Sequence, residues 1–97
     1  MSSERRLISA LAKIMGDTRV TPWNICLFAA ILHYWCENGY QMPIYISRNK
    51  LMSFAHIGSI VTYHKCIRQL TELGYIDYFP SYNPYRGTII FLKTKLN

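Results

Sequence analysis

Acidic residues are scarce in this sequence. Five Asp and Glu stand against eleven Lys and Arg, which gives a formal net charge of +6. The acids are scattered along the chain, so no two carboxylates are paired for acid–base catalysis. The chain also has no nucleophile–base set and no Gly-rich loop that would hold a phosphate. These absences predict that the protein is not an enzyme.

Cysteine is also scarce. Cys26, Cys36 and Cys66 are far apart and form no Cys-x-x-Cys pair. The three histidines have no ligand spacing with the cysteines or with one another, so we expect no zinc and no other cofactor. Two of the cysteines lie within apolar helical patterns. That usage favours buried, reduced thiols in a cytoplasmic protein over a disulfide framework.

Long apolar runs are missing as well. The most apolar stretch, residues 25–36, is interrupted by His33 and is shorter than the roughly 20 residues that a membrane-spanning helix needs. The basic start of the chain is not followed by the apolar core and cleavage site of a secretory signal. We therefore expect a cytoplasmic protein with no membrane partner.

The positive charge is concentrated in the second half of the chain. The first 46 residues hold four bases and three acids, whereas residues 47–97 hold seven bases and two acids. A basic half of this kind predicts a polyanionic partner, nucleic acid before a membrane surface. Charge alone is equally compatible with a basic protein that binds no polyanion.

The first 39 residues predict two helices. Apolar residues recur at helical spacing over residues 4–15, and Thr21 before Pro22 marks the start of a second helix that ends near Gly39. The second helix is apolar almost all round, so it must be covered almost all round. Because a domain of 97 residues can hardly cover it alone, a homodimer through these two helices and a monomer are both open.

The rest of the chain predicts a short strand, two helices and two strands. We expect the strands at residues 43–46, 75–79 and 88–93 and the helices at residues 48–55 and 59–73. Ser47 and Ser59 are the helix caps, and Gly74 ends the second helix. The last two strands are joined by a loop rich in turn residues, which is typical of a hairpin.

Three stretches carry a resemblance to a known family. They are Ser47-Arg48-Asn49-Lys50-Leu51, then Ile57-Gly58-Ser59, then the run from Thr62 through Leu70-Thr71-Glu72-Leu73-Gly74-Tyr75-Ile76. In this order they resemble the supporting helix, turn, recognition helix and first wing strand of the winged helix-turn-helix superfamily of bacterial DNA-binding regulators. The resemblance covers residues 47–92, and the style of the N-terminal half is similar to small regulators encoded on mobile elements.

The resemblance implies an α+β fold in a single domain over residues 1–97. This winged helix-turn-helix fold has about four helices, a short strand and a C-terminal β-hairpin wing. Residues 1–39 form the N-terminal helices, with the dimer interface if there is one. Residues 47–93 form the helix-turn-helix and the wing.

The second helix of the motif is the expected reader of bases in the major groove. Its candidate DNA contacts are Ser59, Val61, Thr62, His64, Lys65, Arg68 and Gln69. Arg68 and Lys65 suit guanine or phosphate, Gln69 suits adenine, and Val61 or Thr62 suits a thymine methyl group. The competing interpretation is an ordinary solvated helix face.

Two further segments add candidate contacts. Arg48, Asn49 and Lys50 stand at a helix N-terminus, which favours phosphate. Tyr85 and Arg86 lie in the wing loop, where an Arg can enter a narrow minor groove or hold a phosphate. Alternatively, the serines are only caps and the loop tyrosines pack on the domain.

The expected function is therefore sequence-specific binding of double-stranded DNA, as a transcriptional regulator or an accessory factor of replication or transfer. The alternative is a winged-helix adaptor that binds protein and no DNA, with apolar surface near Trp23, Phe28 and Trp35 as its working site. A ligand sensor is a third alternative, because the helix rich in Trp and Tyr would line a pocket.

Overall fold

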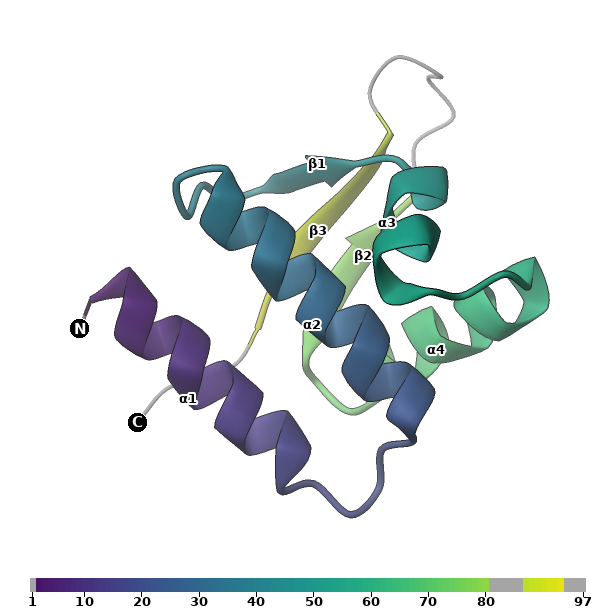
Figure 1. Cartoon of the computed structure of the whole chain (residues 1–97), viewed down its shortest axis with the longest axis horizontal. Helices are drawn as coiled ribbons and strands as arrows, with labels where there is room; N and C mark the ends of the chain where they lie inside the picture. The colour runs from purple at the N-terminus through teal and green to yellow at the C-terminus, as the bar shows by residue number, and fades with distance from the viewer. Residues whose placement is uncertain (1, 81–86, 94–97) are drawn as a thin grey trace.

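The computed structural model describes residues 2–80 and 87–93. Over these residues the chain forms four helices and a three-stranded antiparallel sheet (Figure 1). The elements are α1 (Ser3–Met15), α2 (Pro22–Glu37), β1 (Ile44–Ile46), α3 (Arg48–Ala55), α4 (Ile60–Glu72), β2 (Ile76–Phe79) and β3 (Thr88–Leu92). This confirms the expected α+β class and the expected order, with each boundary within one residue of its predicted place.

Short-range hydrogen bonds set where the helices begin. Thr21 forms a capping box at the start of α2: Asn24 N donates to Thr21 Oγ1 at 3.2 Å, and Thr21 N donates to Asn24 Oδ1 at 2.8 Å. Ser47 and Ser59 accept from the backbone N–H three residues on, at 3.2 and 3.3 Å. These starts depend on neighbours in the sequence, which is why the sequence predicts them.

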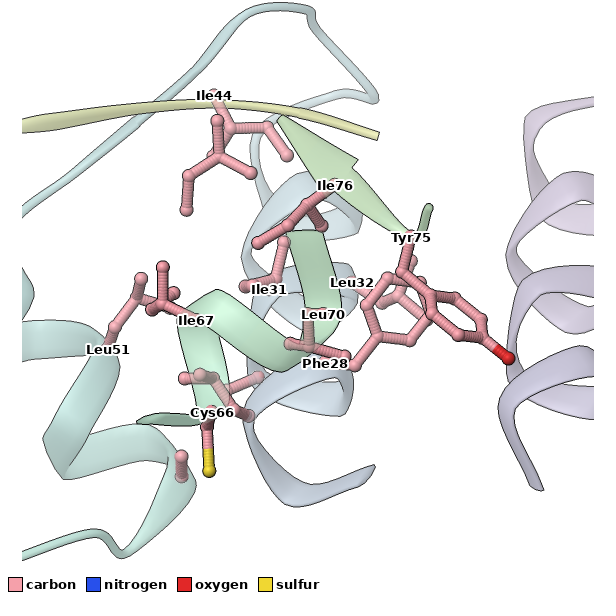
Figure 2. Close-up of a cluster of buried hydrophobic side chains, with 14 of the residues drawn as sticks. Phe28, Ile31, Leu32, Ile44, Leu51, Cys66, Ile67, Leu70, Tyr75 and Ile76 are labelled. Carbon is pink, nitrogen blue, oxygen red and sulfur yellow. The ribbon is translucent and has the colours of Figure 1, made fainter. Parts of the chain in front are cut away.

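Helix α2 lies at the centre of the molecule. Figure 1 shows it crossing in front of the sheet, with α1 on one side and α3 and α4 on the other. In Figure 2, Phe28, Ile31 and Leu32 of α2 lie in one cluster with Leu70 of α4 and Ile76 of β2. The chain itself therefore covers most of α2. The homodimer was expected because α2 was thought to need a second chain to cover it. The structure does not show that need.

The sheet contributes one face to the core. Strand β3 pairs with β1 and with β2, in the order β1-β3-β2, and Ile44 lies opposite Ile90. Ile44, Ile76 and Ile90 face the helices and are buried, while Tyr45 and Phe91 on the other face are exposed. This alternation fixes the register, because a slip by one residue would exchange the two faces.

The three cysteines differ in exposure. Cys66 is buried in the core, Cys36 is half-buried and Cys26 is exposed on α2, and all three are free thiols. The prediction of buried thiols is therefore confirmed for Cys66 and wrong for Cys26. The helix pattern around Cys26 is apolar on nearly every side, so it does not show which side the rest of the chain leaves open.

A polar cluster fastens the α1–α2 loop to the start of β2. The Asp17 carboxylate accepts from Arg19 Nη2 at 2.7 Å, from Arg19 Nε at 2.9 Å and from Tyr75 Oη at 2.7 Å. Hydrogen bonds from Arg19, then from Tyr75, hold the pKa of Asp17 well below its usual value. Burial, with the neighbouring Asp17, raises the pKa of Tyr75 to about 12. The cluster ties together parts of the chain 58 residues apart.

The Asp17 cluster predicts a specific loss of stability in acid. A carboxyl whose pKa is lowered on folding stabilises the protein above its unfolded pKa of about 4, and this contribution is lost as the pH falls below that value. The free energy of unfolding should therefore fall more steeply from about pH 5 to about pH 2 in the native protein than in Asp17→Asn. Urea denaturation at a series of pH values measures this. Asp77→Asn, whose carboxylate lies 3.6 Å from Lys93 at the surface, should keep the native profile. Parallel profiles for Asp17→Asn and the native protein would contradict the role of the cluster.

Gly87 predicts a second stability effect. Its φ is +69°, and a Cβ there would lie 3.0 Å from the backbone of Ile46 and Ser47. Gly87→Ala should lower the free energy of unfolding by about 1–3 kcal/mol, because strain and a backbone clash combine. Gly58→Ala is the control, since its Cβ would meet no atom within 4 Å. Equal urea midpoints for the two variants would show that the close approach at Gly87 is relaxed without cost.

Candidate nucleic-acid interface

Residues 56–59 join α3 to α4 in a tight turn. His56 has φ of 58°, in the left-handed region that residues other than Gly rarely adopt. Ile57 N donates to Met52 O at 2.9 Å, and the Ile57 side chain is buried. The turn is therefore fastened to the core, and this holds the two helices in one relative orientation.

The inner face of α4 packs against α2 and the sheet. Its buried residues are Tyr63, Cys66, Ile67 and Leu70. The hydroxyl oxygens of Tyr63 and Tyr78 lie 3.1 Å apart, which links α4 to β2. Burial, followed by this hydrogen bond, raises the pKa of Tyr63 well above its usual value. Since one side of α4 is committed to the core in this way, the opposite side faces solvent.

The outward side of α4 carries most of the predicted base contacts. Ser59, Val61, His64, Lys65 and Arg68 are exposed, and Thr62 and Gln69 are half-buried. Val61 is 75% exposed, so its side chain is available for contact. The apolar pattern of α4 thus identified both faces correctly.

Negative charge is sparse on this side of the molecule, because Glu72 in the last turn is the only acid of α4. No acid occurs between Glu37 and Glu72 in the sequence. The two ion pairs seen among the described residues, Asp17–Arg19 and Asp77–Lys93, lie elsewhere. Among the described residues, neither Lys65 nor Arg68 forms an ion pair, although Glu72 lies one turn beyond Arg68. Their positive potential is therefore available to a polyanion.

Gln69 makes a hydrogen bond that the sequence did not suggest. Its Oε1 accepts from Asn24 Nδ2 at 2.9 Å, and Asn24 is 0% exposed. Asn24 already serves the capping box of α2 through Oδ1, so Gln69 completes the hydrogen bonding of a buried amide. The partners are 45 residues apart, and no local pattern reports such a contact.

Trp23 borders the same surface, although the sequence placed it in a different hypothesis. It is 52% exposed at the start of α2, and with Thr62 and Lys65 it lines a pocket of about 150 Å³. The start of α2 lies beside α4 because Asn24 and Gln69 join them. The sequence carried no signal for this, because only the packing of α2 on α4 brings Trp23 beside Lys65.

The start of α3 supplies one basic group toward α4. Arg48, Asn49 and Lys50 are all exposed. The charge of Arg48 opposes the rise in the pKa of Tyr63. Lys50 Nζ instead lies 5.0 Å from the ring centre of Tyr34 and 5.9 Å from that of Phe54, in cation–π contact with both. The three residues therefore do not form a single phosphate site.

Tyr85 and Arg86, the predicted contacts of the wing loop, lie outside the described residues. The base of the hairpin is described. Thr88 Oγ1 donates to Ile46 O, and Gly87 packs on the backbone of Ile46 and Ser47. The base of the hairpin therefore lies beside the first residue of α3.

No protein-family model matches this chain, and comparison with curated proteins and with solved structures found no similar protein. None of the helices described is long and apolar enough to cross a membrane. Within residues 2–80 and 87–93, no three His, Cys, Asp or Glu side chains are grouped closely enough to hold a metal ion. The function is therefore argued from the geometry and charge of this surface.

The contact between Asn24 and Gln69 predicts a structural role for Gln69. Gln69→Ala leaves the buried Asn24 Nδ2 without this acceptor, which should lower the free energy of unfolding by about 1–3 kcal/mol. Lys65→Ala, on the exposed side of the same helix, should change it by less than about 0.5 kcal/mol. Urea denaturation compares the two variants. A Gln69→Ala variant as stable as Lys65→Ala would show that the contact contributes nothing.

Proposed function

We propose that this protein binds double-stranded DNA by placing α4 in the major groove. The observation that carries the proposal is the outward side of α4, which presents unneutralised Lys65 and Arg68 beside the exposed Val61. A helix fits the width of the major groove, and basic side chains there bind guanine edges or phosphates. Residues 38–71 contain no acid, and Glu72 stands at the far end of α4 from its N-terminus, which limits the repulsion that phosphates would meet.

The winged helix-turn-helix fold is part of the same proposal. The order α3, turn, α4, β2 and β3 is that of a winged helix-turn-helix, in which α3 supports α4 and the hairpin is the wing. In this arrangement Arg48, at the start of α3, lies near a phosphate next to the groove. Tyr85 and Arg86 keep the minor-groove role predicted for them from the sequence.

Within α4 the reading side chains divide by position. Lys65 and Arg68 are three residues apart, so they lie on one side of the helix and meet the same stretch of groove. Val61 and His64 stand nearer the N-terminus of α4, where a thymine methyl or a base edge is within reach. Gln69 is engaged with Asn24, so its proposed part is to hold α4 on α2.

The biological role that fits such binding is steric. A regulator or accessory factor of replication or transfer that occupies its site blocks or recruits other proteins there. The homodimer expected from the sequence stays a proposal. Ile8 and Met15 are the exposed apolar side chains of α1 through which it would form. Two copies would occupy half-sites about one helical turn of DNA apart.

The adaptor hypothesis keeps little of its expected surface. Phe28 is fully buried and Trp35 is 2% exposed, so the prediction that they form an exposed apolar site is wrong. Trp23 alone of the three is exposed, and it borders the outward side of α4. A single exposed Trp is not the contiguous patch that protein docking needs.

A charge-matched pair of variants tests the DNA proposal. Fluorescence anisotropy with a random-sequence duplex across a salt series should show log K falling linearly with log salt. Arg68→Ala should weaken binding about tenfold or more and reduce the salt slope by about one. Arg5→Ala removes the same charge from the exposed side of α1 and should bind like the native protein.

Two outcomes would count against the proposal. Absence of binding at low salt would remove the function itself. Equal weakening by Arg5→Ala and Arg68→Ala would show that only net charge matters and that α4 is not the contact helix.

A further inference from the structure

A pocket lies at the far end of α2 from the candidate DNA surface. It has a volume of about 280 Å³ and is formed where the last turn of α2 meets the chain that leads into β1. Its walls include Tyr34, Trp35, Asn38, Gln41, Pro43 and Tyr45. Figure 1 shows this end of α2 and β1 on the opposite side of the molecule from α4. The pocket is therefore separate from the groove-binding side chains.

Trp35 contributes its indole ring to this wall. The side chain is 2% exposed, and its Nε1 has no acceptor among the described residues. The indole packs edge to face on Tyr40, with ring centres 4.9 Å apart, and the Arg6 guanidinium lies 5.4 Å from its centre. These contacts hold the ring in place, so it is not free to turn toward another acceptor. Buried donors without a partner are rare in proteins and call for an explanation.

Two amides supply the complementary acceptors. Asn38 Nδ2 donates to Tyr34 O at 2.8 Å, and Gln41 Nε2 donates to Gly39 O at 3.5 Å. Each amide nitrogen is thus directed to backbone, which leaves Asn38 Oδ1 and Gln41 Oε1 without a donor among the described groups. The C-terminal end of α2 also favours N–H groups over anions, because of its partial negative charge.

The remaining wall is aromatic and uncharged. Tyr34, Tyr45 and Pro43 offer flat apolar surface, and none of the described residues that line the pocket is charged. The volume is close to the lower limit of small-molecule sites, roughly 300 Å³. Aromatic walls bind planar rings, and amide oxygens select a ring with N–H donors on its edge. A carboxylate or phosphate would meet amide oxygens and no cation.

We propose that this pocket binds a neutral, planar heteroaromatic molecule of the purine base class. Its ring lies on the tyrosine wall and its N–H edge faces Asn38 and Gln41. The site does not rest on the DNA proposal, because it shares no residue with the outward side of α4.

The chain allows a direct optical test. It has two tryptophans, and Trp23→Phe leaves Trp35 as the only one. Adenine and guanine are titrated separately into this otherwise intact chain, and Trp35 fluorescence and the indole N–H resonance are followed. We expect saturable quenching by at least one base, together with a shift of the indole N–H resonance. Quenching that rises linearly without saturation, or no change with either base, overturns the proposal.

Matched variants assign the binding to this pocket. Asn38→Ala should weaken binding at least fivefold, whereas Ser53→Ala, at an exposed polar side chain on α3, should leave it unchanged. Gln41→Ala should weaken binding too, and because Gln41 is exposed it tests the pocket if Asn38→Ala is poorly folded. Native affinity in a folded Gln41→Ala variant would overturn the proposal.

A further experiment distinguishes a free base from a base that is part of a nucleic-acid strand. A mixed-sequence single-stranded oligonucleotide is added to the protein saturated with the free base. Displacement of the base identifies a base presented by a strand as the ligand. Retention of the base identifies a free small molecule.

Discussion

The apolar side chains of helix α2 must be buried away from water, and the other elements pack around α2 to bury them. Leu27, Phe28, Ile31, Leu32 and Trp35 all lie in the core. Full burial of a side chain of this size stabilises a protein by about 1.5–3 kcal/mol, whereas a surface ion pair contributes about 0–1 kcal/mol. Covering α2 therefore outweighs the surface electrostatics of this chain. Helices α1, α3 and α4 and the inner face of the sheet share this covering, so their positions depend on one helix (Figure 2).

The two ends of α2 organise two different surfaces. At its start, Asn24 bonds to Thr21 and to Gln69, which joins helix capping to the placement of α4. At its end, Trp35 and Asn38 form part of a pocket with the chain that enters β1. The candidate DNA surface and the pocket therefore share a rigid support without sharing residues.

Electrostatics then decides which exposed face suits a polyanion. Basic residues occur on several elements, but Arg19 and Lys93 lie beside acids, and Lys50 lies over two aromatic rings. Lys65 and Arg68 form no ion pair among the described residues. The net charge of the chain thus says less about function than the distribution of the bases that remain unneutralised.

The sequence by itself determined where elements begin and end and which side of α4 is apolar. Thr21, Ser47 and Ser59 each accept from the backbone N–H three residues away, so these signals are complete within a short window. The tertiary structure alone decided which parts of α2 stay exposed. Its apolar residues surround the helix, so no periodicity separates the buried Phe28 from the exposed Cys26. The tertiary structure alone also turned Gln69 toward Asn24 and Lys50 toward Tyr34. In each case the partner comes from a distant segment of the chain. Local rules act through short chain separations, whereas the exposure and partners of a side chain depend on which segments the core brings together.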